Sequence, residues 1–198
     1  MVPKVTEEYR RARREEIIAG AVRAFARKGF AAASMADILE EAGVSAGALY
    51  GHFKSKSELV YEVANSVVGG RVVDAERLLA LDPLPSPGEL VGIFMRGVLA
   101  EVKQPSMLVQ LWGQAVTEPE FREVATVIIE RIEHAFQRHI SLWQQREHAL
   151  STEAADAVAI EQTPLFLSAC QGFILQLVIL PGFDIDAYLA AAARHLPR

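Results

Sequence analysis

The stretch Gly43–Lys56, GVSAGALYGHFKSK, decides how the first part of this chain is interpreted. The segments on either side have helical periodicity, yet this stretch carries three glycines within nine residues, Gly43, Gly47 and Gly51. A glycine inside a helix costs about 1 kcal/mol relative to alanine. The letters GVSAG also fit G-x-S-x-G, the pattern of a hydrolase nucleophile elbow. The stretch is therefore a catalytic turn, a plain loop, or a helix whose backbone has to stay bare.

A catalytic role for Ser45 requires a strand before the turn, because a nucleophile elbow joins a strand to a helix. The preceding residues instead continue a helix that begins at Ser34, with Asp37 three residues later in the spacing of a capping box. Gly43 then ends that helix, and Ser45 caps a short third helix. We therefore interpret the stretch as the turn and second helix of a helix-turn-helix, and we expect no catalytic residue and no enzyme activity.

Apolar residues recur at helical spacing along almost the whole chain, and no segment alternates like a strand. We expect an all-α fold, with a three-helix, helix-turn-helix domain at residues 1–56 and a larger helical domain at residues 57–198. The first helix is expected to bury Ile17, Ala21 and Phe25 and to end at Gly29. In the larger domain, a helix over residues 152–180 contains Pro164, which predicts a kink or a split with Thr163 as the new cap.

Charge is divided unevenly between these two domains. Residues 1–56 hold 10 lysines and arginines and 7 acids, whereas residues 57–198 hold 10 and 18, for a net charge of −5. Only the N-terminal domain is therefore suited to a polyanion. Cys170 is the single cysteine and the N-terminus is charged, so we expect a cytoplasmic protein without disulfides or a signal peptide. The longest apolar run, residues 165–180, is short for a membrane span and is expected to be a buried helix.

The sequence has no pattern typical of a metal or cofactor site. His134, His139 and His148 lack the spacing of metal ligands, and neither H-E-x-x-H nor C-x-x-C occurs. Phosphate-binding glycine loops are also absent. We therefore expect no metal and no cofactor.

Several features of residues 43–56 favour a nucleic-acid partner. The stretch contains no acid, and Ala48 at the third helical position leaves the first-turn amides free to face a phosphate. Small side chains permit close approach of the backbone to a groove at Ala46, Gly47 and Ala48. Donors suited to phosphate oxygens follow at Tyr50, His52, Lys54 and Lys56. Four further cations are placed to reach DNA from the start of the first helix: Arg10, Arg11, Arg13 and Arg14.

The segment from Arg14 to Leu59 resembles the DNA-binding domain of TetR-family transcriptional regulators. The resemblance rests on many positions at fixed spacing: Ile17, Ile18, Ala21, Phe25, Lys28, Gly29, Phe30, Ser34, Ile38, Ala42, Gly43, Val44, Ser45, Gly47, Leu49, Tyr50, His52, Phe53, Ser55, Lys56, Glu58 and Leu59. It implies an all-α homodimer in which each subunit places the helix Ser45–Phe53 in the major groove. It also implies phosphate contacts from Ser34, Met35, Tyr50, His52 and Lys56, with Ala46, Gly47 and Ala48 nearest the bases.

The resemblance further implies that a small ligand bound in the C-terminal domain relieves repression. A ligand pocket needs apolar walls and a few polar groups. The candidate lining residues are Met95, Trp112, Phe136, His139, Trp143, Phe166, Cys170 and Phe173, with Gln110 or Gln171 as polar anchors. Their character favours a hydrophobic or aromatic effector. The helix over residues 57–81 joins the two domains and is the expected lever between them.

Residues 165–180 are apolar on nearly all sides, which favours a homodimer formed mainly through this segment and the C-terminal helix. We therefore expect a cytoplasmic repressor that binds a palindromic, double-stranded DNA operator and is released by its effector. Two alternatives remain open. One is a sequence-tolerant, nucleoid-associated DNA binder without an effector, and the other is a helical interaction module with no DNA role.

Overall fold

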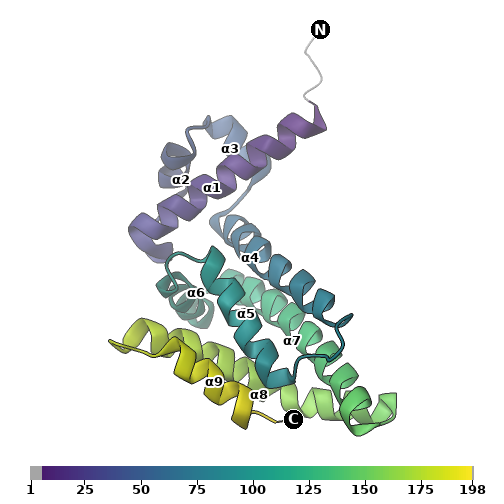
Figure 1. Ribbon diagram of the computed structural model, residues 1–198. Coiled ribbons are helices and arrows are strands. Elements are labelled where there is room, and N and C mark those ends of the chain that lie inside the picture. Colours follow the sequence, from purple (N-terminus) through teal and green to yellow (C-terminus); the bar gives the residue numbers. More distant parts are fainter. Residues whose placement is uncertain (1–5, 198) are drawn as a thin grey trace. The chain divides into compact units, whose positions relative to one another are not determined.

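The computed structural model describes residues 6–197, which form nine α-helices and no strand (Figure 1). The predicted all-α fold is confirmed. The helices are α1 (Glu7–Ala32), α2 (Met35–Ala42), α3 (Ala46–His52), α4 (Lys56–Leu78), α5 (Pro87–Glu101), α6 (Ser106–Thr117), α7 (Pro119–His148), α8 (Thr152–Ile179) and α9 (Ile185–His195).

Contacts between residues divide the chain into two compact units. The first unit holds the residues up to Ser66 together with Gln110–Ala125, and the second holds Val67–Val109 together with the residues from Thr126 onward. This division by contacts differs from the predicted boundary between residues 56 and 57. It does so because residues 110–125, which are remote in sequence, belong to the same compact unit as α1, α2 and α3.

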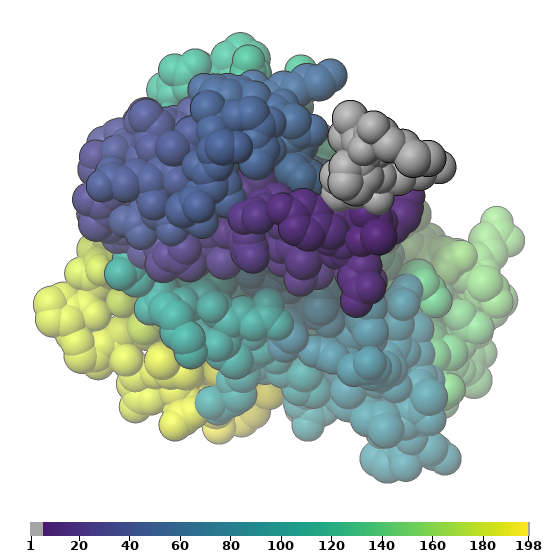
Figure 2. Space-filling model, turned by 90° about the horizontal axis from the view of Figure 1, so that it is seen from above, coloured from purple at the N-terminus to yellow at the C-terminus, as the bar shows by residue number. Residues whose placement is uncertain are grey.

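In the first unit, α1 and α2 cross closely at Gly20. A Cβ atom at Gly20 would lie 2.6 Å from the Cα atom of Ala42, so a larger residue would force the two helices apart. The side of α1 that faces this crossing is buried at Ile17, Ala21 and Phe25, as the sequence pattern predicts. Figure 2 shows the face of this unit on which α1 (purple) and the α2–α3 segment (blue) lie side by side.

Two glycines with positive φ shape the chain in this unit. Gly43 has φ 64° and is the C-cap of α2, donating its N–H to the carbonyls of Leu39 and Glu40. Gly29 has φ 78° and places a kink in α1, after which the helix continues to Ala32. The first helix therefore breaks at Gly29 as predicted, and one further turn, up to Ala32, follows the break.

The core of the second unit is built around α5, which packs against α9 and α8. A Cβ atom at Gly88 would lie 2.7 Å from the carbonyl oxygen of Ala192, so this glycine sets the close approach of α5 and α9. The rings of Phe94, Phe136 and Phe166 form a chain with centroid distances of 5.6 and 6.2 Å. These buried aromatic side chains join α5, α7 and α8.

An arginine bridges α4 and α5 in the same unit. The Arg71 guanidinium lies 3.1 Å from Asp74 and 2.6 Å from Glu101, with only 17% of its side chain exposed. The guanidinium passes over Gly97, where a Cβ atom would collide with Nη1. Gly97 therefore makes room for an ion pair that links the second half of α4 to the end of α5.

Helix α8 runs from Thr152 to Ile179 as one helix with Pro164 inside it. The predicted split at this proline, with Thr163 as a new cap, is therefore wrong. The Thr163 hydroxyl instead donates to the carbonyl of Ala159 at 2.7 Å, and the Ser168 hydroxyl donates to the carbonyl of Pro164 at 2.7 Å. Such side-chain bonds to the carbonyl four residues earlier often bend a helix.

By length and composition alone α8 could also cross a membrane, and only 28% of its most apolar window is buried in this chain. The expectation that residues 165–180 form a buried helix is therefore wrong for the single chain. Large apolar side chains are exposed along it, at Ile160, Leu165, Leu175, Val178 and Ile179. Because such an apolar surface is unfavourable in water, it marks a face that is suited to a partner.

Candidate nucleic-acid interface

The start of α2 is held by a capping box. The Ser34 Oγ accepts the N–H of Asp37 at 3.2 Å, and the Asp37 carboxylate accepts the N–H of Ser34 at 2.8 Å. Lys28 donates to the same carboxylate at 2.5 Å, and this bond, followed by the bonds from Ser34, holds the pKa of Asp37 well below its usual value. The exposed Ser34 hydroxyl is thus fixed at the N-terminus of α2, beside the half-buried Met35.

Ser45 caps α3 in the same way, because its Oγ accepts the N–H of Ala48 at 3.2 Å. Leu49 and Phe53 are fully buried and anchor α3 in the unit. The opposite side is exposed at Ala46, Gly47, Tyr50 and Gly51. The predicted helix cap is confirmed. The solvent-exposed side of α3 has only very small side chains apart from Tyr50, which is 55% exposed.

The candidate DNA contacts do not all lie free at this surface. Ser34, Ser45, Ala46, Gly47, Tyr50 and Lys54 are exposed, whereas Met35, Ala48 and His52 are half-buried. The Lys56 side chain is engaged: its Nζ donates to the carbonyl of Ala31 at 3.2 Å and lies 6.0 Å from the ring centroid of Phe121. Partial burial lowers the pKa of Lys56.

Arg14 joins α1 to the end of α3 and the start of α4. Its guanidinium lies 2.7 Å from a carboxylate oxygen of Glu62 and 5.0 Å from the ring centroid of Phe53. The hydrogen bond to Glu62 raises the pKa of Arg14. This arginine therefore positions α3, and it is not free to reach DNA as the sequence predicted.

A hollow separates the first turns of α1 from α3. It has a volume of ≈ 820 Å³ and is lined by Thr6, Glu7, Tyr9, Arg10 and Arg13 on one side and by Gly47, Ala48, Gly51 and His52 on the other. Sequence reasoning identified the arginines but gave no sign of the hollow, since it arises only when α1 and α3 are packed in one unit.

The predicted effector residues are mostly core. Met95, Phe136, His139, Phe166 and Phe173 are at most 2% exposed. Trp143 and Cys170 are also buried, and burial raises the pKa of the Cys170 thiol to about 12. Gln171 is exposed. Gln110 and the half-buried Trp112 belong to the first unit, with α1, and not to the unit that contains the other eight.

Gln110 has a clear structural role in that unit. Its Oε1 accepts the N–H of Phe30 at 3.1 Å, just after the kink at Gly29. A Cβ atom at Gly29 would lie 2.7 Å from this Oε1, so the glycine and the glutamine fit each other. The side chain of Gln110 therefore holds the end of α1 against α6.

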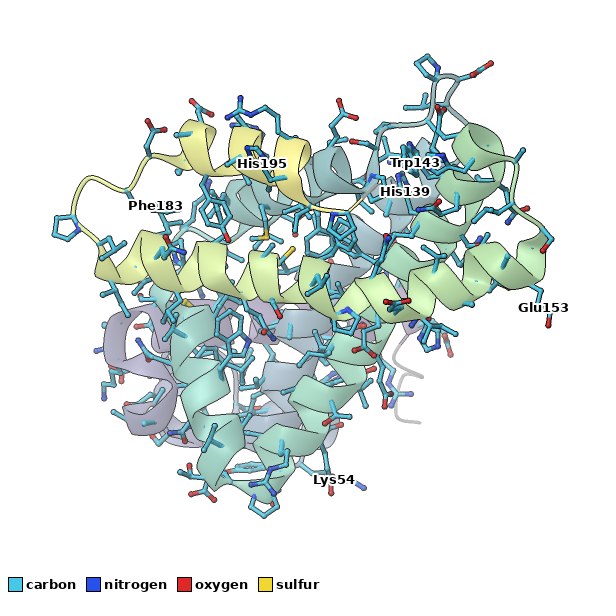
Figure 3. All side chains as sticks on the ribbon, turned by 90° about the horizontal axis from the view of Figure 1, so that it is seen from below. Lys54, His139, Trp143, Glu153, Phe183 and His195 are labelled. Atoms are coloured by element: carbon cyan, nitrogen blue, oxygen red, sulfur yellow. The ribbon has the colours of Figure 1, made fainter. Side chains whose placement is uncertain are left out.

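His139 is the most unusual of the buried candidates. Its Nε2 lies 2.8 Å from the carbonyl oxygen of Pro85, which can only accept, so Nε2 carries the proton. Burial lowers the pKa of His139 despite this bond, which favours the neutral ring. Nδ1 is then a buried acceptor without a hydrogen-bond partner among the described residues. In Figure 3 the ring lies close to Trp143, one turn along α7.

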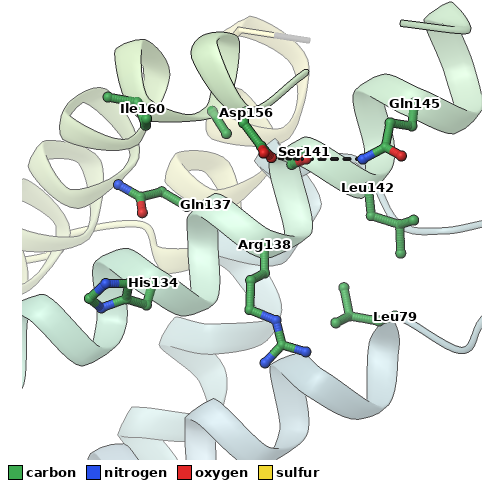
Figure 4. A pocket seen from close by; sticks show the side chains of 10 residues that line it. Leu79, His134, Gln137, Arg138, Ser141, Leu142, Gln145, Asp156 and Ile160 are labelled. Carbon is green, nitrogen blue, oxygen red and sulfur yellow. Dashed lines mark hydrogen bonds between the residues drawn. The ribbon is translucent and has the colours of Figure 1, made fainter. Parts of the chain in front are cut away.

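Two cavities in the second unit are lined by none of the ten candidate residues. One of ≈ 510 Å³ lies between α7 and α8, where Ser141 donates to Asp156 at 2.6 Å and accepts from Gln145 at 3.1 Å (Figure 4). The other, of ≈ 290 Å³, lies between α4 and α5. Across residues 6–197 no group of three or more His, Cys, Asp or Glu side chains is placed to hold a metal ion.

Comparison with known proteins agrees with this geometry. The family profile described as "Bacterial regulatory proteins, tetR family" matches residues 17–63. The chain is 29% identical to the HTH-type transcriptional regulator AcrR of Shigella flexneri over 80% of its length, and 35% identical to the HTH-type transcriptional repressor Rv1474c of Mycobacterium tuberculosis over 52%. These alignments span 65% and 49% of the two relatives' lengths.

Solved structures share the fold over nearly the whole chain. A transcriptional regulator of the TerR/AcrR family from Aquifex aeolicus has a TM-score of 0.66 at 22% identity, with 93% of this chain and 97% of that chain covered. The helix-turn-helix and the helical domain that follows it are therefore shared with a known architecture.

We expect Gln110→Leu to destabilise the protein by about 1 kcal/mol, because the part-buried N–H of Phe30 then loses its acceptor. Urea unfolding followed by circular dichroism measures the effect. The matched control is Gln114→Leu, one turn further along α6, where the side chain makes no recorded hydrogen bond within residues 6–197. Equal losses in the two variants would show that the Gln110–Phe30 bond contributes nothing.

Proposed function

Because the chain belongs to the TetR family of bacterial regulatory proteins, we propose that it is a transcriptional repressor released from a palindromic operator by a small molecule. The observation that carries this proposal is the outer side of α3. It is exposed, nearly bare, and part of a segment, residues 43–56, without a single acid. A polyanion can approach such a surface closely without charge repulsion.

In the proposed complex α3 enters the major groove, with Ala46, Gly47 and Ala48 nearest the base edges. Phosphate oxygens are contacted from the start of α2 by Ser34 and Met35, and from α3 and its C-terminal side by Ser45, Tyr50, His52 and Lys54. The engaged side chain of Lys56 supports a different role for that residue. Bound to the carbonyl of Ala31, it steadies the start of α4.

A homodimer supplies the two-fold symmetry that a palindromic operator requires. The proposed interface is the exposed apolar side of α8, where Leu165, Leu175 and Ile179 are 52%, 43% and 60% exposed. These residues recur at helical spacing, so they form one stripe. The C-terminal helix α9 is proposed to contribute to the same interface.

The effector is proposed to be a hydrophobic or aromatic compound that enters the second unit among the buried aromatic residues. His139 is the proposed anchor, because its Nδ1 can accept a hydrogen bond that no described residue supplies. Such an unpaired acceptor is costly in a core and is satisfied by a ligand with a donor. Binding must favour a state in which the two recognition helices are misplaced, and α4 is the proposed lever.

We expect Ala46→Glu to abolish binding to every duplex. Ala46 is exposed at the start of α3, where a carboxylate favours the helix, so the fold is kept while phosphates are repelled. Fluorescence anisotropy with labelled duplexes measures this. Ala154→Glu, exposed in the first turn of α8, adds the same charge and is expected to bind normally. Unchanged affinity in Ala46→Glu contradicts the proposed surface.

We expect Leu175→Glu to produce monomers, because an unpaired charge in an apolar interface costs about 3–5 kcal/mol. Light scattering after size exclusion gives the mass. The control is Val116→Glu, where the valine is 75% exposed outside the stripe. A dimeric Leu175→Glu protein rules out the α8 interface.

We expect aromatic compounds with a donor, such as phenols, to raise the melting temperature more than their O-methylated analogues, because only the former can bond Nδ1 of His139. The difference should vanish in His139→Phe. Differential scanning fluorimetry over matched pairs provides the measurement. If phenols still raise the melting temperature of His139→Phe more than their O-methylated analogues do, His139 is not the residue that binds the donor.

A further inference from the structure

The hollow between α1 and α3 is not explained by the packing of the unit. Its α3 side consists of Gly47, Ala48, Gly51 and His52, and its α1 side is formed by the first two turns of that helix. These turns precede residue 17, where the match to the family profile begins. The profile match therefore does not cover the α1 side of the hollow.

The glycines on the α3 side are not required by the fold. Among residues 6–197, a Cβ atom at Gly47 or Gly51 would meet no heavy atom within 4 Å, and neither glycine has a positive φ. Glycine is a poor helix former compared with alanine, so its use twice in a seven-residue helix is locally unfavourable. A bare backbone at these positions is explained if something outside the described chain comes close to it.

The charged groups around the hollow favour an anion. Arg10 has no recorded ion pair or hydrogen bond from its side chain within residues 6–197. Arg13 is held in place by the Tyr9 hydroxyl at 2.9 Å and Glu16 at 2.7 Å. His52 faces the hollow from α3, and Glu7 is the one acid among the lining residues. Arginine guanidinium groups are well suited to phosphate oxygens.

We propose that the hollow receives the sugar–phosphate backbone of one DNA strand, with Arg10 bound to a phosphate. This rests on the proposed function, because the occupant is the strand beside the groove that α3 enters. The hollow is continuous with the proposed reading surface, since Gly47 and Ala48 line both. Gly51 leaves the space through which the strand passes. Arg13, already fixed by Tyr9 and Glu16, forms the wall next to it.

Two arginines that are adjacent in sequence test the contact. Arg10 lines the hollow, whereas Arg11, which the sequence also placed to reach DNA, does not line it. Within residues 6–197 the recorded ion pair of Arg11 is with Glu15 at 4.0 Å, with 76% and 72% of these side chains exposed. Binding to a random-sequence duplex of about 30 base pairs, long enough for two half-sites, is measured by anisotropy at several salt concentrations. Arg10→Ala is expected to reduce the steepness of log K against log salt by about 1.8, because each of the two subunits loses one phosphate contact of about 0.9, and Arg11→Ala to leave it unchanged.

Filling the hollow gives a second, steric test. Gly51→Leu places bulk in the hollow without a clash inside the protein, and leucine favours the helix, so the melting temperature should not fall. Its salt slope should become less steep by about 1.8 or more, since at least one phosphate contact is displaced in each of the two subunits. Gly113→Leu, exposed on α6 and equally free of neighbours, adds the same bulk away from the hollow and should bind as the wild type does.

The outcomes separate this inference from the proposed function. If the wild-type protein binds the duplex but Arg10→Ala and Arg11→Ala have equal slopes, or Gly51→Leu binds normally, the strand does not occupy the hollow and the proposed function stands. If the wild-type protein binds no duplex at low salt, both fail. The inference is supported if the salt slope becomes less steep in Arg10→Ala and in Gly51→Leu but not in Arg11→Ala or Gly113→Leu.

Discussion

The close crossing of α1 and α2 is the constraint from which the rest of the DNA-binding unit follows. It exists because Gly20 has no side chain to hold Ala42 away. The left-handed turn at Gly43 then redirects the chain, and Ser45 starts α3 at once. Leu49 and Phe53 anchor that short helix, so its outer side is left with two glycines, alanines and one exposed tyrosine. Because burial of Leu49 and Phe53 holds α3 in place, its outer side does not need large side chains for stability.

Local signals in the sequence were sufficient for most of the fold. The caps at Ser34 and Ser45 and the turn at Gly43 depend on residues within four positions of each other, and all three are confirmed. Asp184 caps α9 in the same local way, by accepting the N–H of Ala187. The helix break at Gly29 is likewise confirmed. The split at Pro164 is wrong, because α8 continues through the proline as one helix although proline removes one helical hydrogen bond.

The candidate sites were less predictable because they depend on tertiary partners. Nothing in the sequence showed that Gln110 accepts the N–H of Phe30, that Lys56 turns to the carbonyl of Ala31, or that Arg14 pairs with Glu62. Periodicity identifies apolar residues such as Phe136 and Phe166 but does not separate a core from a pocket wall. The hollow beside α3 forms only where α1 and α3 pack together, so no local pattern in the sequence could indicate it.

The central claim is that α3, presented twice by a dimer, reads a symmetric DNA sequence. Selection of bound duplexes from a random pool with the purified protein tests this claim most directly. The account predicts enrichment of one sequence with two inverted half-sites, centred about one helical turn, or a multiple of it, apart. Recovery of duplexes without any common sequence would contradict it and would favour a sequence-tolerant DNA binder. Recovery of no DNA at low salt would exclude a DNA role altogether.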